Sequence, residues 1–262
     1  MKPGHLLFDK DNICFYQPEL RRRDWSGIFM HLLIIFLFIF AGSPFHLNAQ
    51  TTVTSSITSS SDDLEEAGAN GASPGNMFLN SGDLEMVQDD AAGNAGTQKI
   101  GLRFNSISIP KGATITNSYI TFTAVGASSP NTNSGVTNLT IRGQAADNPG
   151  TFTTTLYDLS NRGTTSASTA WSSIAAWTTG VSYNTPALNT IVQELVNRSG
   201  WTSNNSMVFI ITGTGHRSAE SWDNASSNQP VLTITYTTIS SSANTTNVSL
   251  PQGTDGAIDI TV

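Results

Sequence analysis

Acidic residues gather soon after position 60 and have the chemistry of a metal site. Four of them lie within five positions and a fifth follows in the next polar segment; they are Asp62, Asp63, Glu65, Glu66 and Asp83. Calcium binds six to eight oxygen ligands, mainly carboxylates and carbonyls in loops. Alternate residues of a strand share a face, so Asp63 and Glu65 can point together. We therefore predict a structural calcium site here; the alternative is a solvated acidic loop.

Aromatic residues in two polar segments have the chemistry of a saccharide-binding surface. The candidates are Trp171, Trp177, Trp222 and Tyr183. The first two lie in the Ser-, Thr- and Ala-rich stretch 165–180, which we interpret as a loop with little demand for core residues. Aromatic faces offer flat apolar area on which the C–H face of a sugar can stack. The alternative is that these residues belong to the core, since tryptophan is highly buried on average. Trp201 follows a predicted helix, and we assign it to the core.

A third group combines a titratable imidazole with charged neighbours, namely His216, Arg217, Glu220 and Asp223. A histidine with a pKa near 6.5 can serve as an acid or a base at neutral pH. The chain shows no serine elbow and no paired-carboxylate pattern, and residues 50–262 contain a single histidine. We therefore interpret Arg217 and Glu220 as a loop-fixing salt bridge and predict that the protein is not an enzyme.

The first 49 residues have the pattern of a secretory signal peptide. A basic group at 21–23 precedes the apolar run 28–41, and Ala49 offers a small residue at a cleavage site. The competing interpretation is a transmembrane anchor, but the run is shorter than the roughly 18–20 apolar residues that span a bilayer. The leader before the apolar run is long, so translation starts at either Met1 or Met30. We expect a secreted or cell-surface protein with no membrane span after cleavage.

The composition of residues 50–262 limits the possible partners. This segment has no cysteine, and its 15 acidic and 7 basic residues give a net charge of −8. Disulfides and zinc–thiolate sites are therefore excluded there. Nucleic-acid binding is also disfavoured, because it needs clustered positive charge. A neutral polymer or a metal cation suits this surface better.

Short polar-apolar runs separated by turn signals predict an all-β fold. We expect strands over 76–80, 83–87, 99–109, 114–125, 136–144, 151–156, 207–213 and 230–237. This spacing favours an antiparallel jelly-roll β-sandwich over a parallel sheet. We place the sandwich at 50–238. Residues 239–262 then form a linker and the unpartnered first strand of a truncated repeat.

One segment, 185–200, instead has helical periodicity. Its apolar residues Leu188, Ile191, Val192, Leu195 and Val196 recur at the spacing of one helix face. Thr185 can cap such a helix, Pro186 suits its first position and Gly200 can end it. We predict one short amphipathic helix that covers part of the sandwich.

Several stretches together resemble a jelly-roll module of bacterial exported proteins. They are 100–123 (IGLRFNSISIPKGATITNSYITFT), 139–153 (LTIRGQAADNPGTFT), 185–201 (TPALNTIVQELVNRSGW), 210–224 (IITGTGHRSAESWDN) and 229–236 (QPVLTITY). This pattern is similar to the DNRLRE-type carbohydrate-binding or surface modules, and the likeness covers about residues 55–238. The tail 244–262 resembles the opening strand of SprB-type repeats of gliding-bacterium adhesins. The resemblance implies a non-catalytic module in a larger surface protein.

From these observations we expect an extracellular, non-catalytic module that binds a polysaccharide or surface glycan. The alternative is a structural or adhesion spacer with no small ligand. Exposure of the tryptophans separates the two, because a sugar platform needs aromatic faces that are open to solvent.

Overall fold

The computed structural model describes residues 50–71, 73–89, 96–126, 133–238, 242–246 and 257–261. The predicted signal peptide at 1–49 lies outside these residues. Within the described part of the chain, no helix is both long enough and apolar enough to cross a membrane.

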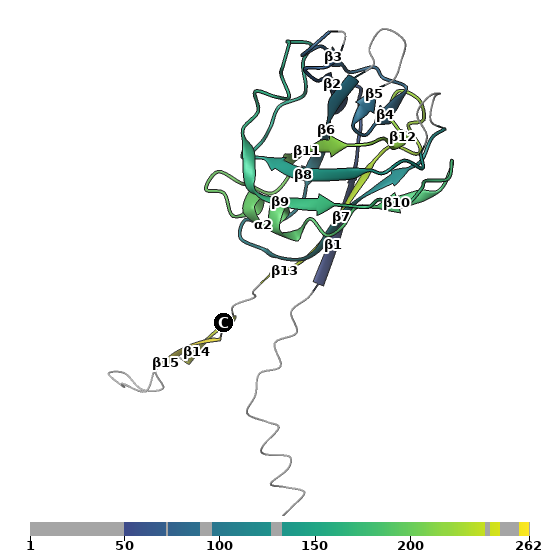
Figure 1. Cartoon of the computed structure of the whole chain (residues 1–262). Coiled ribbons are helices and arrows are strands. Elements are labelled where there is room, and N and C mark those ends of the chain that lie inside the picture. The colour runs from purple at the N-terminus through teal and green to yellow at the C-terminus, as the bar shows by residue number, and fades with distance from the viewer. Residues whose placement is uncertain are drawn as a thin grey trace, which may run out of the picture. The chain divides into compact units, whose positions relative to one another are not determined.

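The protein forms an antiparallel sandwich of two main sheets, as the sequence predicts (Figure 1). Its eight principal strands are β1 (Gln50–Ser56), β6 (Gly96–Ile107), β7 (Thr114–Thr123), β8 (Asn138–Gln144), β9 (Thr164–Trp171), β10 (Ser182–Asn184), β11 (Asn205–Thr214) and β13 (Val231–Thr237). One sheet has the order β1-β13-β7-β10, and the other contains β6-β11-β8-β9. If the eight principal strands are counted from 1 to 8 along the chain, the first sheet has the order 1-8-3-6 and the second has the order 2-7-4-5. This is the strand order of a jelly roll. The predicted jelly-roll sandwich is confirmed.

Shorter strands extend this framework at one end. Strands β2 (Asp63–Ala67) and β3 (Met77–Phe78) continue the second sheet beyond β6, and β5 (Gln88–Asp89) also pairs with β6. Strand β4 (Asp83–Glu85) pairs with β12 (Ser218–Glu220). A separate hairpin joins β14 (Ser242–Thr246) to β15 (Ala257–Thr261). The prediction of an unpartnered strand near residue 257 is therefore wrong, because part of the expected linker forms its partner.

The main core lies between the two sheets and follows strand alternation. In β13, Leu232 and Ile234 are buried while the intervening residues are half-exposed. In β6, the inward positions include Phe104, whose ring meets Phe209 of β11 edge-on with centroids 6.0 Å apart. Period-two alternation of this kind is what an antiparallel sheet with one buried face requires.

The predicted helix is confirmed, but it is shorter than expected. Helix α2 (Asn189–Val196) buries Ile191, Val192, Leu195 and Val196 and packs against β7, β8 and β9. Its N-cap is Leu188, and no side chain caps it. Thr185 instead hydrogen-bonds to the backbone of Ile120 in β7, through both its amide and its hydroxyl. The capping prediction is wrong because the threonine side chain extends the sheet instead.

A loop over 144–163 covers the outer face of the second sheet. The expected strand at 151–156 is wrong, because this stretch is irregular and ends in turns. Phe152 and Leu159 of the loop form a second apolar cluster with Leu64, Val208 and Ile210. A Cβ at Gly101 would lie 2.9 Å from the Phe152 ring. The loop can approach the sheet closely because β6 carries a glycine at this point.

The chain enters and leaves the sandwich at the same end. Gln50, the first residue of β1, pairs with Thr237, the last residue of β13. Figure 1 shows β2 and β3 at the opposite end of the sandwich from these two positions. Features near β2 therefore lie far from the points at which the sandwich connects to the rest of the chain.

Candidate functional site

The predicted acidic cluster is a buried strand and not a solvated loop. Asp62, Asp63, Glu65 and Glu66 are each at most 4 % exposed. Asp63 and Glu65 pair with inward-facing residues of β6, so both lie on the interior side of the sheet, as alternation predicts. Glu66 lies on the outer side. The structure therefore divides the five predicted metal ligands between different environments.

Asp62 has an ion-pair partner of its own. Its carboxylate lies 2.6 Å from Nη1 of Arg103 and also accepts hydrogen bonds from Thr58, Ser59 and Asn105. Buried charges are retained when they are paired and fully hydrogen-bonded. This contact fixes the start of β2 against β6.

The interior acids share a crowded, water-poor environment. Glu65 accepts hydrogen bonds from the backbone amide of Glu85 (2.6 Å) and from the side chain of Gln98 (2.8 Å). Burial, with nearby Asp83 and Asp89, raises the pKa of Glu65 to about 8. Burial and the same neighbours raise the pKa of Glu85 to about 9. Desolvation places these carboxyl groups in their protonated form over much of the neutral range.

Asp63 belongs to the same interior side. Burial raises its pKa to about 7, although it accepts a hydrogen bond from the backbone amide of Trp222. Among the described residues, no three Asp, Glu, His or Cys side chains are arranged to hold a metal ion. Calcium binding at the five predicted residues therefore stays a prediction.

The predicted aromatic surface is largely core. Trp171 ends strand β9, and Trp171 and Trp177 are only 8 % and 6 % exposed. Both rings pack near Phe122 of the facing sheet. Tyr183 stacks on Trp177 with centroids 4.9 Å apart and an interplanar angle of 6°. The interpretation of 165–180 as a loop without core demand is wrong, because its aromatic residues close one end of the sandwich.

The remaining tryptophans also pack inward. Trp201 is fully buried, as predicted, and its indole nitrogen donates to the carbonyl of Ile109. Trp222 is half-buried and packs against the main core. Trp171, Trp177 and Trp201 are therefore closed to a sugar ring, whereas Trp222 is only partly covered and its binding role stays a prediction.

The histidine–arginine group is structural. Arg217 is fully buried and donates to the carbonyl oxygens of Gly135, Ile174, Ala175 and His216 and to the Thr137 hydroxyl. Glu220 instead accepts from Asn224, so the predicted Arg217–Glu220 salt bridge is wrong. The Asp223 carboxylate accepts from Ser60. His216 is 4 % exposed and is held between the Gln88 carbonyl and the Ser218 hydroxyl.

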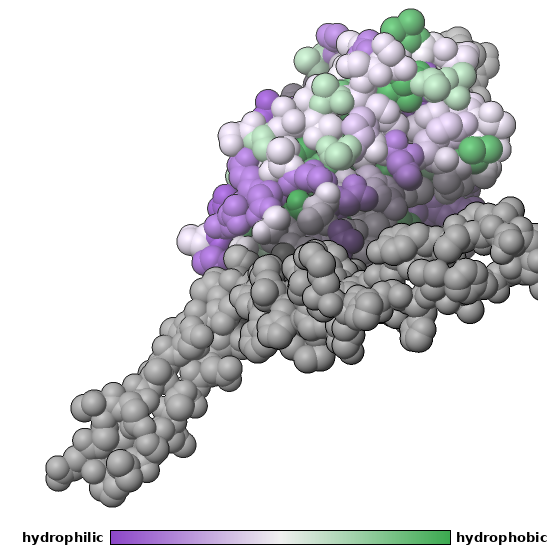
Figure 2. Space-filling model, turned by 90° about the horizontal axis from the view of Figure 1, so that it is seen from below, coloured by the Kyte–Doolittle hydropathy of each residue, from purple (hydrophilic) through white to green (hydrophobic). Residues whose placement is uncertain are grey.

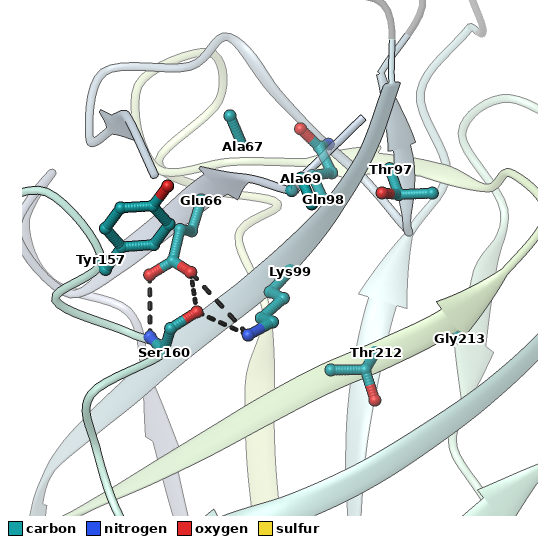
Figure 3. Close-up of a pocket in the computed structure, with 11 residues that line it drawn as sticks. Glu66, Ala67, Ala69, Thr97, Gln98, Lys99, Tyr157, Ser160, Thr212 and Gly213 are labelled. Carbon is teal, nitrogen blue, oxygen red and sulfur yellow. Dashed lines mark hydrogen bonds and ion pairs between the residues drawn. The ribbon is translucent and has the colours of Figure 1, made fainter. Parts of the chain in front are cut away.

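A concave site lies where β2, β6 and β11 meet the covering loop (Figure 3). It encloses about 380 Å³. It is lined by Glu66, Ala67, Gly68, Ala69, Thr97, Gln98, Lys99, Tyr157, Ser160, Thr212 and Gly213. We call it the β2 pocket. Its volume is within the range of small-molecule sites, near the lower limit.

Three polar side chains of the β2 pocket form one hydrogen-bonded group. Ser160 donates to Glu66 through both its amide, at 2.8 Å, and its hydroxyl. Lys99 Nζ lies 2.5 Å from the Ser160 hydroxyl and 3.9 Å from the Glu66 carboxylate. The Glu66 side chain is 2 % exposed and that of Lys99 is 37 % exposed. Ser160 thus fixes the Glu66 carboxylate, while the Lys99 ammonium remains open to a ligand.

Tyr157 supplies the exposed aromatic surface of this pocket. It is 43 % exposed and follows Leu156, which is 55 % exposed. Its φ of 62° lies in the left-handed region, which is uncommon for residues other than glycine. Its amide donates to the Gly75 carbonyl, and its ring lies against Gly75, where a Cβ would come within 2.6 Å. The ring is thereby held in place at the rim.

The chain matches no protein-family model and no curated protein. The resemblance stated from the sequence therefore remains an expectation, and the function must be argued from the geometry of the site.

Of the polar group, only Glu66 was predicted from the sequence. Ser160 and Lys99 were not, because 33 to 94 positions separate the three members in the chain, and the neighbouring Tyr157 was not predicted either. One signal was available. Lys99 is one of only two lysines in residues 50–262, and it is the first residue of the strand predicted over 99–109.

Proposed function

We propose that the sandwich is a non-catalytic saccharide-binding module and that the β2 pocket is its binding site. The observation that carries this proposal is the exposed Tyr157 ring beside the hydrogen-bonded Glu66–Ser160–Lys99 group, in which Glu66 is buried and Lys99 is open to solvent (Figure 3). Sites for small polar ligands combine apolar or aromatic walls with a few fixed polar groups. The pocket has both features.

The chemistry of the pocket suits a sugar. Each sugar hydroxyl both donates and accepts hydrogen bonds, and here the Lys99 ammonium can donate and the exposed Ser160 hydroxyl can accept, while the buried Glu66 carboxylate holds Ser160 in place. Charge-assisted hydrogen bonds of this type are stronger than neutral ones. The Tyr157 ring can cover the apolar C–H face of the same sugar. The opposite charges of Lys99 and Glu66 lie side by side, which favours a ligand without net charge.

The position of the pocket also supports recognition. It lies near β2, whereas the chain enters and leaves at the paired residues Gln50 and Thr237. A module attached at one end exposes its opposite end to a polymer or a neighbouring surface. We propose that the module belongs to a larger secreted or cell-surface protein and binds a polysaccharide or surface glycan there.

The test is a glycan-array screen with the full protein, followed by calorimetry on the best soluble oligosaccharide. We expect Tyr157→Ala and Lys99→Met to weaken binding at least tenfold, because each removes a ligand-facing group. Lys111→Met is the matched control, since Lys111 is exposed and, within the described part of the chain, its ammonium donates to the Ser199 carbonyl alone. Thermal unfolding of each variant verifies that the sandwich stays folded.

A second candidate function has its own support. The burial of Trp171, Trp177 and Trp201 is what a structural or adhesion spacer without a small ligand requires. A folded protein that binds no glycan on the array would overturn the saccharide proposal and favour this spacer function.

A further inference from the structure

The sheet β1-β13-β7-β10 contains no charged residue in any of its four strands. Its inward side chains form one side of the main core. Its outward side chains are uncharged, and all but Val231 and the ring of Tyr119 are polar, although residues 50–262 carry 22 acidic and basic groups. Solvated faces of antiparallel sheets ordinarily contain charged side chains among the polar ones. The outer face of this sheet differs from that pattern.

Threonine dominates this outer face. Strand alternation and register place nine threonines on it, which we call the threonine face: Thr52, Thr54, Thr114, Thr116, Thr121, Thr123, Thr233, Thr235 and Thr237. All are exposed or half-exposed. Neighbouring strands lie about 4.8 Å apart, and alternate residues of a strand about 6.8 Å apart. The hydroxyls therefore form rows across the sheet.

Several of these side chains are already held in place. The hydroxyls of Thr52 and Thr235 lie 3.0 Å apart, and Gln50 donates to Thr116 at 2.8 Å. Thr121 donates to Asn184 of β10 at 2.8 Å. A hydroxyl has one donor and two acceptor positions, so each retains capacity for a ligand. Side chains that are ordered beforehand lose less conformational entropy when a ligand binds.

One aromatic residue lies within the threonine face. Tyr119 of β7 pairs with Thr233, which in turn pairs with Thr54 of β1. Tyr119 is half-buried, and its neighbours two positions along the strand include Thr121. Among the described residues its hydroxyl has no hydrogen-bond partner. The face thus contains one aromatic ring, and threonine hydroxyls precede and follow this ring along the strands.

The chemistry of this face selects the type of ligand. A charged polymer finds no opposite charge on it, and a protein partner finds no apolar core of the kind that interfaces contain. The large exposed apolar residues Val136, Leu156, Tyr157 and Val181 all lie outside the four strands. On the side shown in Figure 2, pale residues are the most frequent, strongly hydrophilic ones gather toward one end, and hydrophobic ones form separate small patches. A neutral, hydroxyl-rich polymer matches the face in both charge and hydrogen bonding.

We infer that the threonine face, with Tyr119 as its aromatic contact, is a second binding surface for a neutral polysaccharide chain. This inference takes its ligand class from the proposed function. Its binding surface is separate, because it contains none of the residues that line the β2 pocket. The volume of the pocket, about 380 Å³, suits a short saccharide, whereas an open face can contact a longer chain. The module then binds a polymer through two surfaces.

The experiment is retention of the full protein on insoluble cellulose, insoluble β-1,3-glucan and starch granules, with an alginate gel as the anionic comparison. The background is Tyr157→Ala, which removes the pocket contact. We expect retention on at least one neutral polymer, a loss of at least fivefold on adding Tyr119→Ala or Thr235→Lys, and no retention on alginate. Tyr119→Phe keeps the ring, and Val136→Lys adds the same charge off the face; both are expected to retain binding.

The two proposals fail in different ways. The inference is overturned if no neutral polymer retains the protein, or if Tyr119→Ala and Thr235→Lys leave retention unchanged. The proposed function is overturned if Tyr157→Ala leaves binding of the soluble oligosaccharide unchanged. Thermal unfolding of Tyr119→Ala separates loss of binding from loss of fold.

Discussion

The most acidic strand of the molecule is buried, and its least charged sheet is open to solvent. Strand β2 contains three carboxylates in five residues, and all five residues are buried. The sheet β1-β13-β7-β10 contains no charged residue and presents rows of threonine outward. This arrangement inverts the usual rule that charged side chains are exposed and rarely fully buried.

The difference teaches which groups stabilise the fold and which are available for ligands. At β2, charge is used internally, in the Asp62–Arg103 pair and the Glu66–Ser160–Lys99 group. Such contacts are costly to break because an unpaired charge would stay buried. At the threonine face, side-chain contacts such as Thr52–Thr235 are exposed, so we expect each of them to contribute little to stability.

The largest effect is expected from breaking the buried ion pair at β2. Asp62→Ala should lower the free energy of unfolding by about 3–5 kcal/mol, because it leaves Arg103 half-desolvated without its carboxylate. Asp147→Ala is the matched control, since the Asp147–Arg198 pair is 39 % and 32 % exposed and should contribute about 0–1 kcal/mol. Denaturant unfolding measures both. Equal losses for the two variants would contradict the contrast drawn between buried and exposed charge.

A smaller but specific effect is expected from pH. Burial raises the pKa values of Asp63, Glu65 and Glu85 to about 7, 8 and 9, above their unfolded values of about 4. The native state therefore binds more protons, and stability decreases as pH rises through this window. We expect the thermal midpoint to be higher at pH 5 than at pH 9. Glu85→Gln should flatten this dependence.

The outcome that opposes this account is a thermal midpoint that rises from pH 5 to pH 9. Repeating the titration with calcium and with EDTA also tests the predicted calcium site. A calcium-dependent stabilisation that grows with pH and is lost in Glu85→Gln would place the ion among these carboxylates.

The smallest effect on stability is expected at the threonine face. Thr235→Ala removes the hydroxyl pair with Thr52, and cross-strand pairs of this type contribute roughly 0.2–1 kcal/mol. The free energy of unfolding should fall by no more than about 1 kcal/mol, as measured by denaturant unfolding. A loss as large as that of Asp62→Ala would show that the face is part of the stabilising structure and would weaken the comparison.

Much of the fold was predictable because it depends on local periodicity. The alternation in β13 and the helical spacing of Ile191, Val192 and Leu195 identify their buried faces directly. Strand β9 was not predicted because its Ser, Thr and Ala residues are also typical of a loop. Its only large apolar residue is the last one, Trp171. Strand alternation placed Asp63 and Glu65 on one face, but the burial of β2 was not predicted. Acidic residues are rarely buried, and here hydrogen bonds from residues distant in sequence, such as Gln98, satisfy them.

The candidate site was far less predictable than the fold. Aromatic content alone could not separate Trp171 and Trp177, which are core, from Tyr157, which is exposed. The difference arises from tertiary packing, since Trp171 and Trp177 pack near Phe122 of the facing sheet. The polar group of the pocket joins β2, β6 and a loop, so no single stretch of sequence contains it.

The most direct test of the central claim is to map a bound oligosaccharide by amide NMR on the isotopically labelled protein. The saccharide found on the glycan array is titrated in, and backbone shifts are followed at each residue. The account predicts the largest changes at Glu66, Lys99 and Tyr157, with little change around Trp171 and Trp177. Changes centred on the buried tryptophans, or none near the β2 pocket at saturating ligand, would contradict it.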